Sequence, residues 1–234
     1  MAHIGPQGQR RISSSSVLII GLGGLGSPAA IYLATAGVGE LVISDFDVVE
    51  ESNLQRQIIH ASSSVGQLKT ESARRTLQTL NPACKVVTLE HELAGEELTL
   101  AVQKADVVLD CSDNFDTRFA VNRACVNHAT PLVSAAAIRL EGQMMCYLPA
   151  VDAPCYQCLY GDLQDDAPTC AAEGILGPVV GAMGTLQALS ALLILTGNGG
   201  HLPGQLTLFD GLTMEWRKLK LTRDPNCPVC ASTA

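Results

Sequence analysis

The sequence is short of positive charge. Its 234 residues include 15 Lys and Arg against 23 Asp and Glu, which gives a formal net charge of −8 with neutral histidines. A nucleic-acid-binding domain needs a basic face, so this balance argues against DNA or RNA as a partner. It still allows a small basic pocket, for which Arg56, Lys69 and Arg74 are candidates.

Segments that would take the chain to or through a membrane are also lacking. The N-terminus is short and polar, with no apolar stretch before Ser13–Ser16 that could act as a secretory leader. The longest apolar run, near Ile175–Leu195, is interrupted by three glycines and a proline, and a buried helix explains it better than a membrane span. We therefore expect a cytoplasmic protein with no membrane partner.

Internal repeats, low-complexity stretches and a clear interdomain linker are absent too. Hydrophobic residues make up 47% of the chain, and its 21 glycines fit many tight turns between strands and helices. This length is enough for one substantial core.

Short β-branched runs alternate with helical segments in the first half of the chain. The predicted strands are Val17–Ile20, Leu41–Ser44, Lys85–Leu89 and Val107–Leu109. The predicted helices are Ser27–Gly37, Val65–Leu80 and Glu96–Lys104. This alternation predicts a Rossmann-like, doubly wound α/β fold with a mainly parallel sheet. Further strands, antiparallel to one another, are expected within Pro131–Leu148 and Gln205–Thr222, with one long helix between them.

A glycine-rich loop joins the first predicted strand to the first predicted helix. Gly21, Gly23 and Gly26 have the G-x-G-x-x-G spacing, which allows a tight turn and brings backbone N–H groups close to a phosphate. Asp45 ends the second strand, where a carboxylate can accept hydrogen bonds from ribose hydroxyls. Glycines that served packing alone would not need this acid, so the loop indicates a bound nucleotide. Taken alone, the loop points to NAD and a NAD-dependent oxidoreductase.

Polar residues farther along the chain favour a different nucleotide. They are Ser52, Asn53, Arg56, Gln57, Lys69, Asp113 and Asn114. Asp45 and Asp113 follow two strand ends, where the ligands of a parallel sheet bind. A triphosphate needs cations and a Mg²⁺ ion held by a carboxylate, whereas hydride transfer needs neither. Arg56 or Lys69 could each be a solvated surface charge, and Asp113 could be a helix cap, but the set as a whole indicates Mg-ATP.

The nine cysteines include two C-x-x-C pairs, Cys155 with Cys158 and Cys227 with Cys230. One such pair could be a redox site, but four thiolates can close the tetrahedral shell of a structural Zn²⁺ ion. The gap between the pairs is longer than in zinc ribbons, so their spacing alone is suggestive. Four other cysteines lie in apolar segments, and we expect them to act as small core residues: Cys84, Cys111, Cys125 and Cys146. The five histidines have no ligand spacing.

Together these motifs resemble the HesA/MoeB/ThiF family, the bacterial relatives of ubiquitin-activating enzymes. The resemblance is carried by Gly21–Gly26, Ser52–Gln57, Asp113–Asn114 and the cysteine pairs. It covers residues 5–230 and implies one adenylation domain. Residues 1–130 would form the nucleotide-binding half, and residues 131–230 the carrier-binding half with the zinc site. The implied enzyme is an adenylyltransferase that uses Mg-ATP to activate the C-terminal glycine of a small ubiquitin-like sulfur carrier.

The resemblance also implies roles for individual residues. Gly24 would contact the phosphates and Asp45 the ribose. Asn53, Arg56 and Lys69 would hold the triphosphate and stabilise the charge of the departing pyrophosphate. The carrier carboxylate is already ionised at neutral pH, so no general base is required.

Two further residues are assigned through the resemblance. Asp113 would bind Mg²⁺, with Asn114 beside it. Cys170 lies where family members often have a cysteine on a crossover loop, which in some of them forms a thioester or acyl-disulfide with the carrier. An exposed, unreactive thiol is the alternative, because adenylation itself does not need this cysteine.

The sequence departs from the family pattern at its N-terminus. Family chains usually begin with Arg-Tyr-x-Arg-Gln ahead of a segment like Ile4–Gln9, and in dimeric members one of those arginines reaches the partner's ATP. The sequence does not contain this stretch, so either it is truncated or this member lacks the contact. A symmetric homodimer is expected from the resemblance.

The carrier and the activity leave alternatives open. Ala136–Gln143 and Leu219–Cys230 look closer to MoeB, and Gly177–Gly181 and Leu208–Gly211 closer to ThiF. The longer match favours MoaD, of molybdenum cofactor synthesis, over ThiS, of thiamine synthesis. The other activities considered are a partner that binds a ubiquitin-like protein without activating it and a NAD-dependent oxidoreductase.

Overall fold

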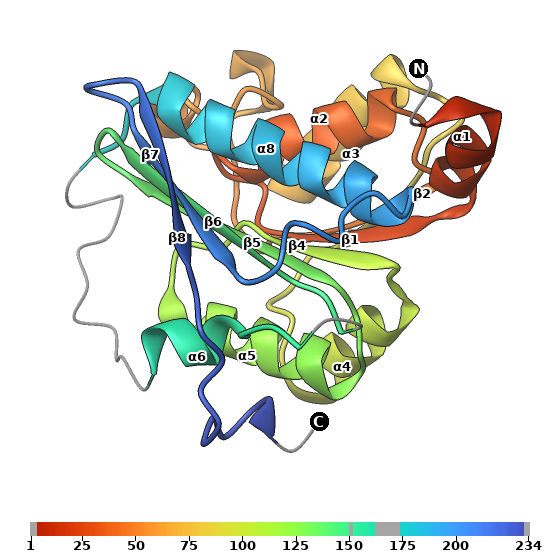
Figure 1. Ribbon diagram of the computed structural model, residues 1–234. Helices are drawn as coiled ribbons and strands as arrows, with labels where there is room; N and C mark the ends of the chain where they lie inside the picture. Colours follow the sequence, from red (N-terminus) through yellow and green to blue (C-terminus); the bar gives the residue numbers. More distant parts are fainter. Residues whose placement is uncertain (1–3, 150–151, 162–173, 232–234) are drawn as a thin grey trace.

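Eight strands form a single twisted sheet with helices on both faces (Figure 1). The computed structural model describes residues 4–149, 152–161 and 174–231. The strands are β1 (Ser16–Ile20), β2 (Glu40–Ser44), β3 (Lys85–Leu89), β4 (Val107–Asp110), β5 (Leu132–Ile138), β6 (Glu141–Tyr147), β7 (Gln205–Asp210) and β8 (Glu215–Lys220). The helices are α1 (Gly5–Ser14), α2 (Gly26–Thr35), α3 (Lys69–Leu80), α4 (Gly95–Lys104), α5 (Phe115–Asn127), α6 (Tyr156–Tyr160) and α8 (Gly177–Leu195), with short 3₁₀ turns η1 (Glu51–Asn53) and η2 (Ser62–Ser64).

The strand order β3-β2-β1-β4-β5-β6-β7-β8 changes direction next to β1. The strands from β3 to β5 pair in parallel, and β6, β7 and β8 extend the sheet as an antiparallel meander. The chain moves outward from β1 to β3 and then crosses back to β4, so β1 and β4 border a topological switch point. Ligands of open α/β sheets bind at the carboxyl ends of the strands beside this point.

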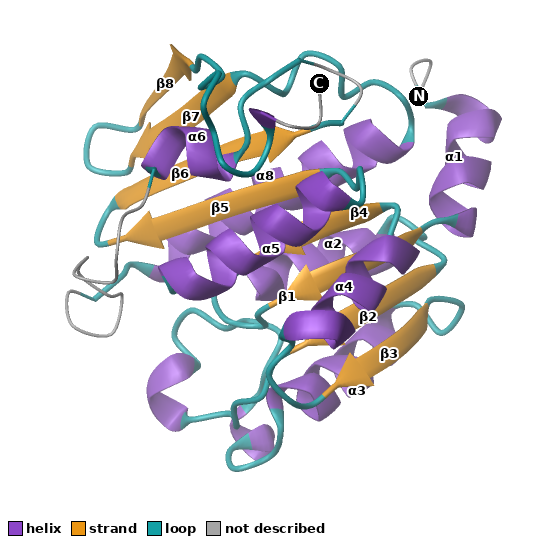
Figure 2. Cartoon of the chain, turned by 90° about the horizontal axis from the view of Figure 1, so that it is seen from below, coloured by secondary structure: helices purple, strands orange, loops and turns teal. Residues whose placement is uncertain are grey.

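Helices α2, α3 and α8 lie on one face of the sheet, and α4, α5 and α6 lie on the other (Figures 1 and 2). The central strands β1 and β4 are buried on both faces because helices cover both. This burial explains their unbroken apolar runs. The predicted α/β fold with a mainly parallel sheet and an antiparallel C-terminal part is confirmed.

The long apolar segment forms α8, a helix of 19 residues. By length and composition alone it could cross a membrane. In this fold it packs against α2 and against β4, β5 and β6, and its Met183 and Gln187 side chains are fully buried. The structure therefore accounts for α8 as a core helix.

The predicted elements match in place, with two kinds of difference. The helix expected from Val65 begins only at Lys69, because Gly66 has a φ of 82° and Val48 bridges to Leu68 just before it. Helices α1, α5 and α6 were not predicted at all. In α5, Arg118 and Asn122 are among the buried residues, so its apolar periodicity is weak.

Candidate functional site

A cavity of about 910 Å³ opens at the carboxyl ends of β1, β2 and β4 and continues along β5 to β8. Its nucleotide end includes Gly21, Gly23, Gly24, Asp45, Asn53, Arg56, Gln57, Lys69, Asp113 and Asn114. Its other end includes Ala136, Ala137, Gly142, Gln143, Leu208 and Arg217. The structure thus brings most of the predicted site residues to one place. Of the predicted nucleotide-binding residues, Ser52 and Gly26 do not line this cavity.

The glycine loop is shaped by close backbone contacts. Gly21 has a φ of 92°, a conformation that favours glycine. A Cβ on Gly26 would overlap the Gly21 carbonyl, so Gly26 serves the packing of α2 under the loop. A Cβ on Gly24 would meet the Val180 side chain of α8 at 2.8 Å. The loop is therefore wedged between the sheet and α8, and Gly21, Gly23 and Gly24 face the cavity.

Asp45 holds the glycine loop directly. Its Oδ2 accepts a hydrogen bond from the Leu22 N–H at 2.7 Å, and its Oδ1 accepts one from the Asp47 N–H at 2.9 Å. Burial raises the pKa of the Asp45 carboxyl, while the positive charge of Lys69 lowers it. Each carboxylate oxygen can accept a second hydrogen bond, so the predicted contact with a ribose hydroxyl is compatible with this support role.

Lys69 is a buried cation between two carboxylates. It is the first residue of α3, its side chain is 7% exposed, and its Nζ lies 2.7 Å from Asp47 Oδ2 and 3.8 Å from Asp45 Oδ1. Asp47 was not predicted as a site residue, although an acid two residues after a strand-ending acid was a usable signal. The cavity wall here carries charges of both signs.

The segment that follows β2 carries Arg56, the second cation that lines the cavity. Gln57 Nε2 donates to Asn53 Oδ1 at 2.7 Å, and the Arg56 guanidinium lies 3.4 Å from the Ser52 carbonyl. Gln57 Oε1 is buried and has no hydrogen-bond partner among the described residues. Ser52 is exposed and its hydroxyl donates to Glu50 at 3.3 Å. Arg56, Asn53 and Gln57 therefore form a polar wall of the cavity, whereas Ser52 does not line the cavity.

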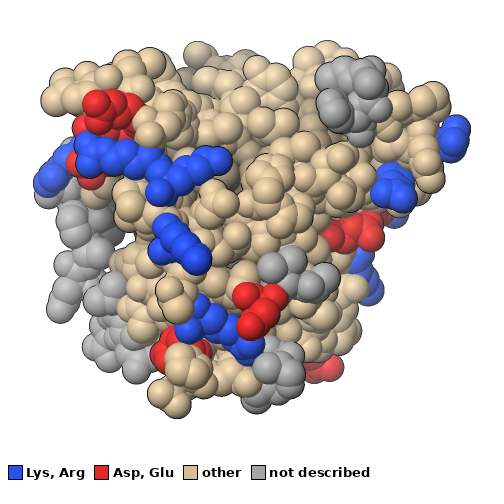
Figure 3. Space-filling model, viewed as in Figure 1, with Lys and Arg blue, Asp and Glu red and all other residues tan. Residues whose placement is uncertain are grey.

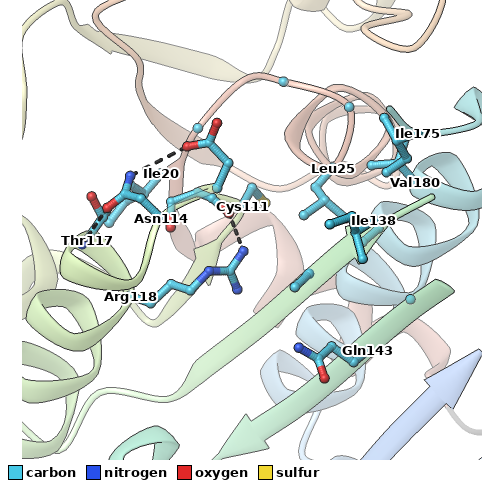
Figure 4. Close-up of a pocket in the computed structure, with 18 of the residues that line it drawn as sticks. Ile20, Leu25, Cys111, Asn114, Thr117, Arg118, Ile138, Gln143, Ile175 and Val180 are labelled. Atoms are coloured by element: carbon cyan, nitrogen blue, oxygen red, sulfur yellow. Dashed lines mark hydrogen bonds between the residues drawn. The ribbon is translucent and has the colours of Figure 1, made fainter. Parts of the chain in front are cut away.

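Asp113 and Asn114 follow β4 at the switch point, and Asn114 is labelled in Figure 4. Asn114 caps α5, because its Oδ1 accepts a hydrogen bond from the Thr117 N–H at 2.8 Å. Capping would have been the ordinary structural role for Asp113, and Asn114 performs it instead. Asp113 keeps an exposed carboxylate on the cavity, and such an oxygen donor set suits a Mg²⁺ ion.

A buried polar network lies under this loop, and it was not predicted. Asp110, only 1% exposed, accepts hydrogen bonds from the Ser112 and Ser134 hydroxyls at 2.6 Å. Arg118 reaches from α5 to within 3.8 Å of Asp110 and donates to the Ala135 carbonyl and to that of Ser112 (Figure 4). These bonds fix the turn that carries Asp113. The sequence offered one signal for this network, because Arg118 follows the capping residue Asn114 by one helical turn.

The four paired cysteines meet on the face of the sheet that α5 covers. Their Sγ atoms lie within 4.8 Å of one another, with separations of 3.7 Å between Cys155 and Cys227 and 3.4 Å between Cys158 and Cys230. Four sulfurs about 2.3 Å from a central zinc ion would be about 3.8 Å apart. The described residues place none of these four cysteines in a disulfide bond, and Asn122 Nδ2 donates to Cys155 Sγ at 3.6 Å. This donor set fits one tetrahedral metal ion.

The other five cysteines are four that lie in apolar segments and Cys170. The apolar-segment cysteines Cys84, Cys111, Cys125 and Cys146 are buried, as predicted, and burial raises the pKa of each thiol. Cys170 lies outside the described residues.

Comparison with known proteins identifies the family. The ThiF family model matches residues 1–229. The ThiS sulfur-carrier adenylyltransferase of Escherichia coli is 48% identical over 226 residues, covering 97% of this chain and 90% of that protein. The molybdopterin-synthase adenylyltransferase of the same species is 44% identical over 223 residues, covering 95% and 90%.

A solved structure shares the fold. The E. coli MccB crystal structure with ATP superimposes with a TM-score of 0.84 at 23% identity, covering 96% of this chain and 69% of MccB. The predicted resemblance is confirmed, as is the prediction that the relatives are adenylyltransferases. The loop, the cavity and the near full-length matches agree, and this chain belongs to the ThiF family.

Proposed function

We propose that this protein uses Mg-ATP to adenylate the C-terminal glycine of a small ubiquitin-like sulfur carrier. The observation that carries the proposal is the continuity of the cavity. It joins the glycine loop, Arg56 and Lys69 to the wall of small side chains at Ala136, Ala137 and Gly142. A triphosphate fits the first part, and an extended chain ending in glycines fits the second.

The reaction needs alignment and charge stabilisation. A carrier carboxylate oxygen attacks the α-phosphorus, the α–β phosphoanhydride bond breaks, and pyrophosphate leaves from an acyl adenylate. In this proposal Asp45 and the N–H groups of the glycine loop orient the nucleotide, with Asn53 and Gln57 on the polar wall. Arg56 and Lys69 stabilise the charge that develops on pyrophosphate. Asp113 would hold Mg²⁺, which would supply further charge neutralisation.

The carrier is proposed to dock over the β7–β8 hairpin. Strand β8 is exposed along its length and carries Arg217, Lys218 and Lys220, although the whole chain is acidic. Figure 3 shows Lys and Arg side chains gathered over this hairpin. Such an edge favours a partner with negative charge near its tail. The identities of 48% and 44% support a ThiS-like and a MoaD-like carrier alike.

Further parts of the proposal concern assembly and environment. We infer a structural Zn²⁺ ion at the four paired cysteines and a homodimer. Exposed apolar side chains such as Tyr32 of α2 and Leu189 of α8, each about half exposed, suit a partner subunit. Nine cysteines, four of them set for a metal, suit a reducing cytoplasm. Covalent chemistry at Cys170 also stays a prediction.

The decisive test is ATP–pyrophosphate exchange with purified carriers. Exchange should require a carrier ending in Gly-Gly, with MoaD-like and ThiS-like carriers assayed in parallel. A carrier lacking its last glycine is the matched control. Exchange that is independent of carrier contradicts the proposal. Capture of the carrier with exchange at background would instead identify a non-activating binding partner.

A further inference from the structure

His60 is buried behind the glycine loop, although no motif singled it out. It is 7% exposed and lies between η1 and α3. Its Nε2 is 3.2 Å from the Leu22 carbonyl oxygen, and its Nδ1 is 2.9 Å from the Ser72 hydroxyl on α3. The ring therefore bridges the glycine loop to a helix on the same face of the sheet.

The two partners define the tautomer of this ring. The Leu22 carbonyl has no proton to give, so Nε2 must carry the hydrogen. Nδ1 is then the acceptor and the Ser72 hydroxyl donates to it. Burial lowers the pKa of His60 to about 4, and the positive charge of Lys69 acts in the same direction. The ring is neutral at pH 7.

Leu22 is held through both of its backbone groups. Its N–H donates to Asp45 Oδ2 at 2.7 Å. Its carbonyl accepts from His60 and, at 3.3 Å, from the Ser27 hydroxyl. The C=O and N–H of a trans peptide point in opposite directions. A Leu22 carbonyl fixed on His60 therefore also fixes the direction of the Gly23 N–H, and Gly23 lines the cavity.

We propose that His60 is a positioning residue for the nucleotide, with its Nε2–H holding the Leu22–Gly23 peptide so that the Gly23 N–H faces the phosphates. The proposal rests on the ATP binding inferred above. His60 touches neither substrate in this scheme; it acts through the peptide that it orients. Ser72 acts one step farther back, because its hydroxyl donates to Nδ1 and so holds the ring in place.

Three variants separate these contacts. His60→Phe keeps a planar ring but removes both hydrogen bonds. His60→Gln can place an N–H donor where Nε2 lies. Ser72→Ala leaves the ring and removes the donor to Nδ1. His201→Gln is the matched control, because His201 is exposed on the loop before β7.

ATP affinity is measured by calorimetry at a temperature well below the melting transition of every variant. His60→Phe should weaken ATP binding about tenfold, the usual effect of one hydrogen bond. His60→Gln should restore most of the affinity, and His201→Gln should match the wild type. Ring ¹⁵N shifts should show an Nε2–H tautomer at His60 in the wild type and in Ser72→Ala, because the Leu22 carbonyl accepts from Nε2 in both.

The outcomes also separate this proposal from the proposed function. A wild-type protein that does not bind ATP defeats the proposed function. Wild-type binding with equal affinity in His60→Phe overturns the role of His60, even if the melting temperature falls. An Nδ1–H tautomer in the wild type overturns it as well.

Discussion

Gly26 packs so closely on Gly21 that a Cβ at position 26 would overlap the Gly21 carbonyl oxygen. The two glycines are five positions apart and close the turn between β1 and α2. Gly23, between them, has room: its nearest neighbour for an added Cβ is Gln57 Nε2 at 3.7 Å. One motif therefore contains a glycine needed for close backbone packing, Gly26, and a glycine that leaves room for a ligand, Gly23.

Alanine at each position should separate these reasons. Gly26→Ala should destabilise the fold by about 1–3 kcal/mol through overpacking, with a matching fall in the denaturant midpoint. Gly23→Ala should leave the midpoint nearly unchanged while weakening ATP binding, since its methyl group projects where a phosphate must approach. Equal stability of the two variants would show that the steric assignment is wrong.

Asp113 should be needed for chemistry and dispensable for folding. Its carboxylate is exposed and Asn114 already caps α5. Asp113→Asn should lower the rate of pyrophosphate exchange by about a hundredfold or more with little change in melting temperature. Asp116→Asn, three residues on and exposed in the first turn of α5, is the control. Comparable losses in both variants would remove the reason for assigning Mg²⁺ to Asp113.

Lowering the pH should reduce the stability of the folded protein through His60. The folded-state pKa is lowered from 6.5 to about 4, so below pH 6.5 the unfolded chain binds a proton that the folded chain does not. Wild-type stability is therefore lost as pH falls from 6.5 toward 4. Asp45, whose pKa is raised, acts in the opposite sense, but it is present in wild type and variant alike.

The comparison of wild type with His60→Phe isolates this contribution. The stability advantage of the wild type, from urea unfolding at each pH, should shrink between pH 6.5 and pH 4 and stay constant above pH 7. An advantage that is constant over the whole range would mean that His60 has an ordinary pKa in the folded protein.

Removal of metal should loosen the C-terminal segment. Cys155 and Cys227 are 72 residues apart, so a bound ion would tie the end of the chain to the segment after β6. Chelation is expected to lower the melting temperature by roughly 5–10 °C, and added Zn²⁺ should restore it. Cys227→Ser should melt at the lower temperature with or without Zn²⁺. Elemental analysis that finds no zinc in wild-type protein purified without chelator would refute the site.

The basic edge strand should govern carrier binding and leave nucleotide binding alone. Replacing both Lys218 and Lys220 with Glu should raise the KM for the carrier about tenfold at low salt, and less at high salt because exposed charges are screened. The KM for ATP should not change. Lys104→Glu, at the end of α4 on the opposite face of the sheet, is the control and should behave as wild type.

The fold was largely readable because its central strands are buried on both faces. Runs such as Val17–Ile20 and Val107–Leu109 leave few alternatives to a parallel sheet. The helix α5 escaped prediction because Arg118 and Asn122 occupy its buried face. Their partners are the loop after β4 and the cysteine cluster, which become neighbours only once the sheet has formed.

The site could be predicted where several residues, taken as a set, indicated a ligand. The glycine loop, Asp45 and Asp113 stand out because each follows the end of a predicted strand. His60 and Asp110 did not, because their roles depend on partners such as Leu22 and Ser134 that are distant in sequence. The division of labour between Asp113 and Asn114 likewise needed the cap geometry of α5. The boundary between the two halves near residue 130 stays a prediction.

The place of β1 in the middle of the sheet has a consequence for synthesis on the ribosome. One edge of β1 pairs with β2 soon after both have emerged, but the other pairs with β4, with Val17 opposite Val107. At roughly 5–20 residues per second, the 90 residues between them take roughly 5–18 s to translate. For that time β1, which is Val, Leu or Ile at every position after Ser16, has one unpaired edge. Nascent chains are therefore most open to mispairing and chaperone capture before β4 emerges.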